Sequence, residues 1–272
     1  MMSQNLVFSL TALLALLPAS LYPYRSVGGA GEQGRSGMFW GALALAVLGP
    51  VIWASVRIGG AWTTGLPTAL WVTIATCMLL FAGLCAVTRS AWRLSPLLLP
   101  YLVAVAVVAT LSEGTRAPML QGGAPGIWID VHIAVSVVTY ALLTLAAVAS
   151  LAAFLQERAL KAKRPTALTR FLPPMAESER LQVRLLVASE VVLGAGLVTG
   201  MAVLHYEQGV SLRFDHKILF SLATFAVIAG LLFAHMRTGV KGRTAARLVL
   251  IAYLLLTLAY LGVKFVADIL KS

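Results

Sequence analysis

The sequence predicts an all-α fold: a polytopic membrane bundle of about eight transmembrane helices, forming a single integral membrane domain over 1–272. Apolar residues make up 60% of the positions and charged residues 11%, against about 25% charged in ordinary soluble domains. The mean hydropathy is +0.89. Apolar stretches near the roughly 20 residues that cross a bilayer recur along the whole chain. These observations exclude a soluble enzyme domain.

The apolar stretches place each helix in turn. The first has neither a basic segment before it nor a small-residue cleavage pattern after it, so we expect it to be retained. Four helices fall within 1–112 and four within 113–272. The predicted spans are 4–22, 37–56, 64–88, 94–112, 128–156, 183–204, 216–236 and 245–270.

The net charge of +11 is distributed as the topology of a membrane protein requires, which argues against nucleic acid as a partner. The basic residues lie mainly between the apolar stretches, most densely over 158–184. Basic connections remain in the cytoplasm. We therefore expect a multi-pass protein of the bacterial inner membrane, with both termini and the connections 113–127 and 205–215 on the periplasmic side.

A polar stripe opens the fifth predicted span. His132, Ser136 and Thr139 are four and three residues apart, a spacing that puts them on one face of a helix. His132 is either an interfacial histidine hydrogen-bonded to a neighbouring helix or an axial ligand of haem iron, for which neutral imidazole is suited. Spacing alone leaves both readings open.

A second histidine, His216, begins the seventh span at the depth expected for His132. Asp215 before it is a typical N-cap, able to accept a hydrogen bond from a free backbone N–H. Two imidazoles from different helices at one depth suit bis-histidine ligation of haem iron in a bundle. Arg213 and Lys217 are near enough in sequence to neutralise haem propionates. We predict these five residues as the cofactor site, and we predict no catalytic residue.

Glu190 interrupts the sixth span. Carboxylates inside a membrane are costly and commonly functional. Glu190 is also close enough to the predicted cytoplasmic edge to extend its carboxylate to the membrane surface or to pair with Arg184. Both interpretations remain open at this point.

Four stretches occur in a characteristic order: 132–141 (His-Ile-Ala-Val-Ser-Val-Val-Thr-Tyr-Ala), Thr199-Gly200, Asp215-His216-Lys217 and 259–266. In this order they resemble the cytochrome c assembly superfamily, the CcsA/CcmC type of haem-handling membrane protein, and most closely its short YpjD-like and HemX-like branch. The resemblance covers roughly 120–270. It implies that haem is bound near the outer face, with His132 at the position of the family's first external haem ligand.

The sequence also departs from the family pattern. The connection that corresponds to the family's tryptophan-rich haem loop, 205–214, contains no tryptophan; Phe233 stands where a helix-seven histidine is expected, and no histidine follows the last span. We therefore expect a protein that binds haem or a related tetrapyrrole and supports cytochrome c biogenesis beside other maturation proteins, without synthase activity. The alternative is a cofactor-free membrane partner or regulator of another membrane or tetrapyrrole-pathway protein.

Overall fold

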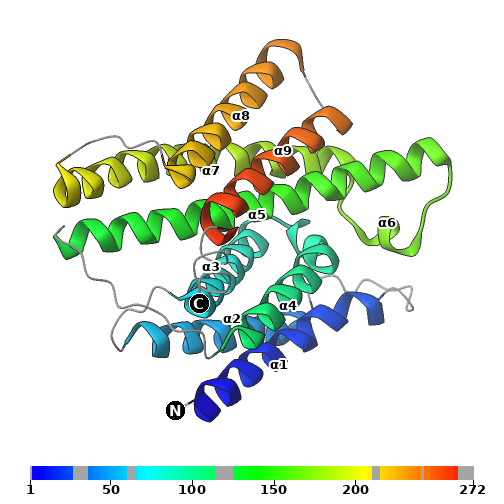
Figure 1. The fold of residues 1–272 in the computed structure, drawn as a ribbon. Coiled ribbons are helices and arrows are strands. Elements are labelled where there is room, and N and C mark those ends of the chain that lie inside the picture. The colour runs from blue at the N-terminus through cyan, green and yellow to red at the C-terminus, as the bar shows by residue number, and fades with distance from the viewer. Residues whose placement is uncertain are drawn as a thin grey trace.

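The computed structural model describes residues 2–26, 36–59, 65–113, 125–209, 215–239 and 242–262, and it confirms the all-α class (Figure 1). Within these ranges there is no strand, and eight helices are long and apolar enough to cross a membrane. They are α1 (Met2–Ser26), α2 (Gly37–Ile58), α3 (Leu66–Val87), α4 (Ser95–Leu111, whose span starts at Ala91), α5 (Gly126–Ala162), α7 (Met175–Gln208), α8 (His216–Thr238) and α9 (Gly242–Thr257, whose span continues to Tyr260). Three short elements complete the described fold: η1 (Ala91–Leu94), α6 (Ala167–Phe171) and the π-helical turn η2 (Leu258–Gly262).

Two helices extend well beyond their predicted apolar spans. α5 continues to Ala162, where Lys163 takes a left-handed conformation with φ 51° and ends it. α7 begins at Met175, directly after Pro174. The extensions are rich in charged residues, and hydropathy does not detect them. A helix satisfies its own backbone hydrogen bonds whatever its side chains, so the polar ends stay helical after leaving the apolar region.

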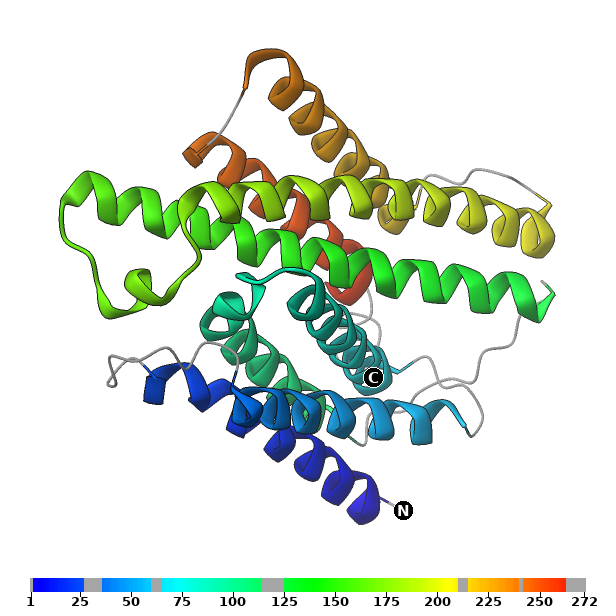
Figure 2. The ribbon, with the colours of Figure 1, turned by 180° about the vertical axis from the view of Figure 1, so that it is seen from behind.

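α5 and α7 form the centre of the molecule. They run antiparallel, side by side, and make the largest helix–helix contact in the described fold (Figures 1 and 2). The group α1–α4 lies on one side of this pair, and within this group α3 makes the largest contact with α5. α8 lies on the other side against α7, while α9 crosses α5. The pair is therefore positioned to build a site together with α8 and α9.

A buried tyrosine cluster connects the two halves of the bundle. Tyr140 of α5 is 1% exposed, and its hydroxyl lies 2.9 Å from that of Tyr253 on α9 and 3.4 Å from that of Tyr101 on α4. Tyr101 and Tyr253 are also hydrogen-bonded to each other. Buried polar groups need such partners. The cluster satisfies its own hydroxyls and fixes α4, α5 and α9 relative to one another.

Candidate functional site

A cavity of about 710 Å³ lies between α5, α7, α8 and the α9–η2 segment. Its volume is within the roughly 300–1,000 Å³ range of ligand sites. Most of the wall is apolar, contributed by leucine, valine, isoleucine, methionine and phenylalanine side chains. Polar side chains from α5 and from the start of α8 also reach it, including His132, Ser136, Thr139, Asp215 and Lys217. An apolar cavity with a few convergent polar groups is what a small-molecule site requires.

His132, Ser136 and Thr139 line this one cavity together, as their spacing predicts. The Ser136 hydroxyl donates to the His132 carbonyl oxygen at 2.7 Å, and the Thr139 hydroxyl donates to the Val135 carbonyl oxygen at 2.8 Å. Each hydroxyl has a single proton. Because the helix uses both protons, these two residues offer oxygen lone pairs to a bound molecule.

The His132 ring is held by α7. Its Nδ1 lies 3.2 Å from the Thr199 hydroxyl oxygen. That hydroxyl has carbonyl acceptors on its own helix, at 3.0 Å from Ala195 and 3.1 Å from Gly196. Since its single proton goes to a carbonyl, the Thr199 oxygen accepts from the ring. From this network we infer that the proton is on Nδ1 and the lone pair on Nε2, a form in which a histidine can bind a metal.

Two glycines on α7 allow this close approach. A Cβ at Gly196 would lie 3.3 Å from Val135 Cγ1 on α5, and one at Gly200 would lie 2.9 Å from Cε1 of His132. Small residues four apart let two membrane helices pack closely. Gly196 and Gly200 therefore decide how near the imidazole lies to its partner Thr199. The pattern Gly-x-x-x-Gly over 196–200 is visible in the sequence and could have indicated this contact, but our sequence-based predictions did not use it.

The other predicted site residues divide into two groups. Asp215 and Lys217 line the same cavity as His132 and are close enough to interact electrostatically. Asp215 directly precedes α8, and its carbonyl oxygen accepts the Leu219 N–H at 2.9 Å. Arg213 and the side chain of His216 lie outside the described residues, although the backbone of His216 begins α8. The pairing of two imidazoles therefore stays a prediction.

The two remaining histidines lie elsewhere. His205 is exposed on α7, with its ring centroid 6.4 Å from that of Tyr206. His235 lines a separate small cavity near the opposite end of α8, together with Glu179 and Gly242. Among the histidines whose side chains are described, His132 alone lines the 710 Å³ cavity. It is the candidate ligand that the geometry favours.

Glu190 lies close to this cavity on α7. It precedes Leu193 and Gly194, both of which line the cavity, by three and four residues, so it lies one helical turn away on the same face. It forms no ion pair with Arg184, and both of its carboxylate oxygens are buried without a hydrogen-bond partner. Of the interpretations that the sequence left open, the ion pair with Arg184 is therefore excluded.

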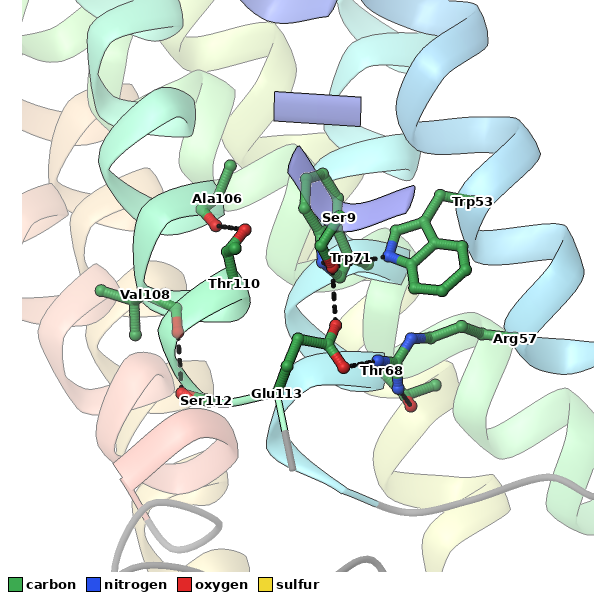
Figure 3. Close-up of polar contacts among 10 residues, drawn as sticks. All are labelled: Ser9, Trp53, Arg57, Thr68, Trp71, Ala106, Val108, Thr110, Ser112 and Glu113. Atoms are coloured by element: carbon green, nitrogen blue, oxygen red, sulfur yellow. Dashed lines mark hydrogen bonds and ion pairs between the residues drawn. The ribbon is translucent and has the colours of Figure 1, made fainter. Parts of the chain in front are cut away.

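A second polar cluster joins the helices of the N-terminal half (Figure 3). The Ser9 hydroxyl donates to Glu113 at 2.6 Å and accepts the indole N–H groups of Trp53 and Trp71, each at 3.1 Å. One donor and two acceptor positions are all that a serine hydroxyl offers. All hydrogen-bonding positions of the Ser9 hydroxyl are therefore occupied, and its three bonds connect α1 to the other three helices.

The same cluster contains a buried ion pair. Arg57 pairs with Glu113, whose side chain is 4% exposed, and donates to the Thr68 hydroxyl at 3.1 Å. Its guanidinium also lies over the Trp53 ring, 4.9 Å from the centroid. Charges so far from water persist only when paired and hydrogen-bonded. The network holds α1–α4 together through specific polar contacts that their sequence pattern did not reveal.

Comparisons with known proteins show to which sequences this chain is similar. The sequence model of the family described as "Cytochrome C assembly protein" matches residues 41–271. A protein of Azospirillum brasilense, described as an uncharacterized 28.8 kDa protein in the nifR3-like 5' region, is 71% identical over 269 residues, 99% of each chain. The inner membrane protein YpjD of Escherichia coli K12 is 27% identical over 180 residues, 66% of each chain. No solved structure matches.

Proposed function

The chain belongs to the cytochrome c assembly protein family, and we propose that this multi-pass membrane protein binds haem or a related tetrapyrrole in the cavity lined by His132. The observation that carries the proposal is the His132–Thr199 contact at 3.2 Å. It orients the ring, and Nε2 would be the nitrogen that coordinates haem iron. Bound haem would supply an iron centre for coordination.

The other walls of the cavity suit such a ligand. A porphyrin face is apolar, and the α7 and α8 walls present Leu193, Leu197 and Phe225 to it. Lys217 lines the cavity at the start of α8, where its ammonium would neutralise a propionate carboxylate. Ser136 and Thr139 would accept hydrogen bonds from polar groups of the ligand. Each of these residues would bind or orient the ligand, which suits a protein that holds haem without attaching it covalently to a polypeptide.

The orientation of the cavity follows from the charge distribution. His132 lies in the second turn of α5, whereas Arg158 and Lys161 lie at the other end of that helix. α7 is antiparallel to α5 and begins near Arg180 and Arg184. Basic ends stay in the cytoplasm. We therefore place the haem cavity at the periplasmic side, where cytochromes c mature, and we propose that the chain supports that process without synthase activity.

Haemin titration of the purified protein in mild detergent tests the proposal. The wild-type protein should develop a Soret band that saturates, and His132→Ala should bind at least tenfold more weakly, as expected when an interaction of about 1.4 kcal/mol or more is lost. His205→Ala, which removes an exposed histidine on the same bundle, is the matched control and should titrate like the wild type. A wild-type protein that leaves the spectrum of free haemin unchanged would instead favour the cofactor-free partner.

A further inference from the structure

A second cavity, of about 450 Å³, lies at the opposite end of the bundle from His132. One wall is the connection between α3 and α4, which contributes Arg89, Trp92 and Arg93. The other is the first part of α7, which contributes Arg180 and Arg184 together with Glu177. The cavity therefore lies between the N-terminal and C-terminal halves of the protein. We call it the arginine pocket.

The arginine pocket carries a large excess of positive charge. Four arginines and one glutamate line it. The ion pairs found among the described residues are Arg57–Glu113 and Lys161–Glu157, so none of these four guanidinium groups has a carboxylate partner there. Like charges gathered around one cavity repel each other unless an anion lies between them. Guanidinium groups are planar forks that match the oxygens of phosphate.

The height of the arginine pocket relative to the membrane spans indicates the source of an anion that would bind there. Trp92 packs edge-on against Phe171 of α6 and Phe39 of α2, with ring centroids 5.1 and 5.9 Å apart. The apolar span of α3 ends at Val87 and that of η1–α4 begins at Ala91. Tryptophan and arginine at the ends of apolar spans lie at the level of lipid headgroups. We therefore expect the phosphates of the adjoining leaflet to lie at the height of the four guanidinium groups.

We propose that the arginine pocket binds the phosphate of an anionic phospholipid between the two halves of the bundle. On the topology argued above this is the cytoplasmic leaflet, which is rich in anionic lipid, and basic pockets between membrane helices on this side bind such headgroups. A lipid held there contacts Arg89 and Arg93 on one half and Arg180 and Arg184 on the other. It stabilises the docking of the halves, independently of whether haem is bound.

Native mass spectrometry of the full-length protein tests this assignment. Wild-type protein in detergent should retain dioleoyl phosphatidylglycerol in preference to dioleoyl phosphatidylcholine. The double variant Arg180→Ala/Arg184→Ala should bind the anionic lipid roughly 25-fold more weakly, about fivefold for each arginine removed. The matched control Arg158→Ala/Arg164→Ala loses the same charge from exposed positions that do not line the pocket. It should bind the lipid like the wild type.

Thermal unfolding supplies a second readout. Phosphatidylglycerol should raise the midpoint of the wild type and of the control variant, but not that of the pocket variant. Equal loss of lipid from both double variants would overturn the proposal, because net charge alone would then explain binding. A wild type without preference for the anionic lipid would overturn it as well. Stabilisation by inorganic pyrophosphate but not by lipid would reject the phospholipid in favour of a soluble phosphate.

Discussion

The imidazole Nδ1 of His132 lies 3.2 Å from the hydroxyl oxygen of Thr199, and this contact joins α5 to α7 at the wall of the 710 Å³ cavity. It is a contact between residues 67 apart in the sequence. Two carbonyl oxygens of α7 lie within reach of the Thr199 proton, and we infer that the threonine accepts a hydrogen bond from Nδ1–H of the histidine. Thr199 thus determines which ring nitrogen remains free for a ligand.

Removing the Thr199 hydroxyl should weaken haem binding while His132 stays in place. Thr199→Val keeps the shape of the side chain but leaves Nδ1–H without this acceptor. Loss of the partner that orients a histidine ligand reduces affinity about 10- to 100-fold. Haemin titration followed at the Soret band measures the change. Thr199→Ser retains the hydroxyl and should bind within a few fold of the wild type; equal affinity for valine and serine variants would argue against the assigned tautomer.

Gly200 should tolerate no side chain if His132 occupies its present position. The Cβ introduced by Gly200→Ala would lie 2.9 Å from the imidazole Cε1, so the ring or α7 must shift, and we expect haem affinity to fall at least tenfold. Gly230→Ala on α8 is the matched control, since nothing lies within 4 Å of its Cβ. Alanine in an open helical position stabilises by about 0.5–1 kcal/mol. Haemin titration and thermal unfolding of both variants distinguish an effect on the haem site from an effect on helix stability.

The sequence was sufficient for the membrane class, the eight spans and the stripe of His132, Ser136 and Thr139. Each depends on composition or on spacing within one helix, which the sequence displays directly. The contact with Thr199 and the Arg57–Glu113 pair join different helices, and their formation depends on how the helices pack. The hydropathy pattern also did not predict that the charged ends of α5 and α7 are helical, because hydropathy detects burial in lipid and not helicity. Arg213 and the side chain of His216 lie outside the described residues, so their predicted roles stay predictions.

The ion pair of the N-terminal half should contribute strongly to stability when only one partner is removed. The Arg57 and Glu113 side chains are 13% and 4% exposed. Glu113→Gln leaves the guanidinium without its counter-charge, and breaking a buried pair costs about 3–5 kcal/mol. The double variant Arg57→Met/Glu113→Gln should recover part of this loss. Thermal unfolding in detergent checks the series, and additive effects of the two changes would show that the residues are not coupled.

Replacing Glu190 by its neutral isostere should stabilise the protein. Both carboxylate oxygens are buried without a hydrogen-bond partner, and an unsatisfied buried polar group costs about 1–3 kcal/mol, more when charged. Glu190→Gln removes the charge at constant shape and should raise the unfolding midpoint in detergent. Asp130→Asn, at an exposed position of α5, is the control and should leave the midpoint unchanged. A lower midpoint for Glu190→Gln would mean that the carboxylate has a stabilising partner.

The most direct test of the account is chemical rescue at position 132. The variant His132→Gly lacks the side chain that we assign as the iron ligand, and free imidazole can occupy the space it leaves. We predict that the variant binds haemin weakly and that added imidazole restores the wild-type Soret band and affinity. Wild-type affinity and band position in His132→Gly without imidazole would contradict the central claim, because haem would then be held by residues other than His132.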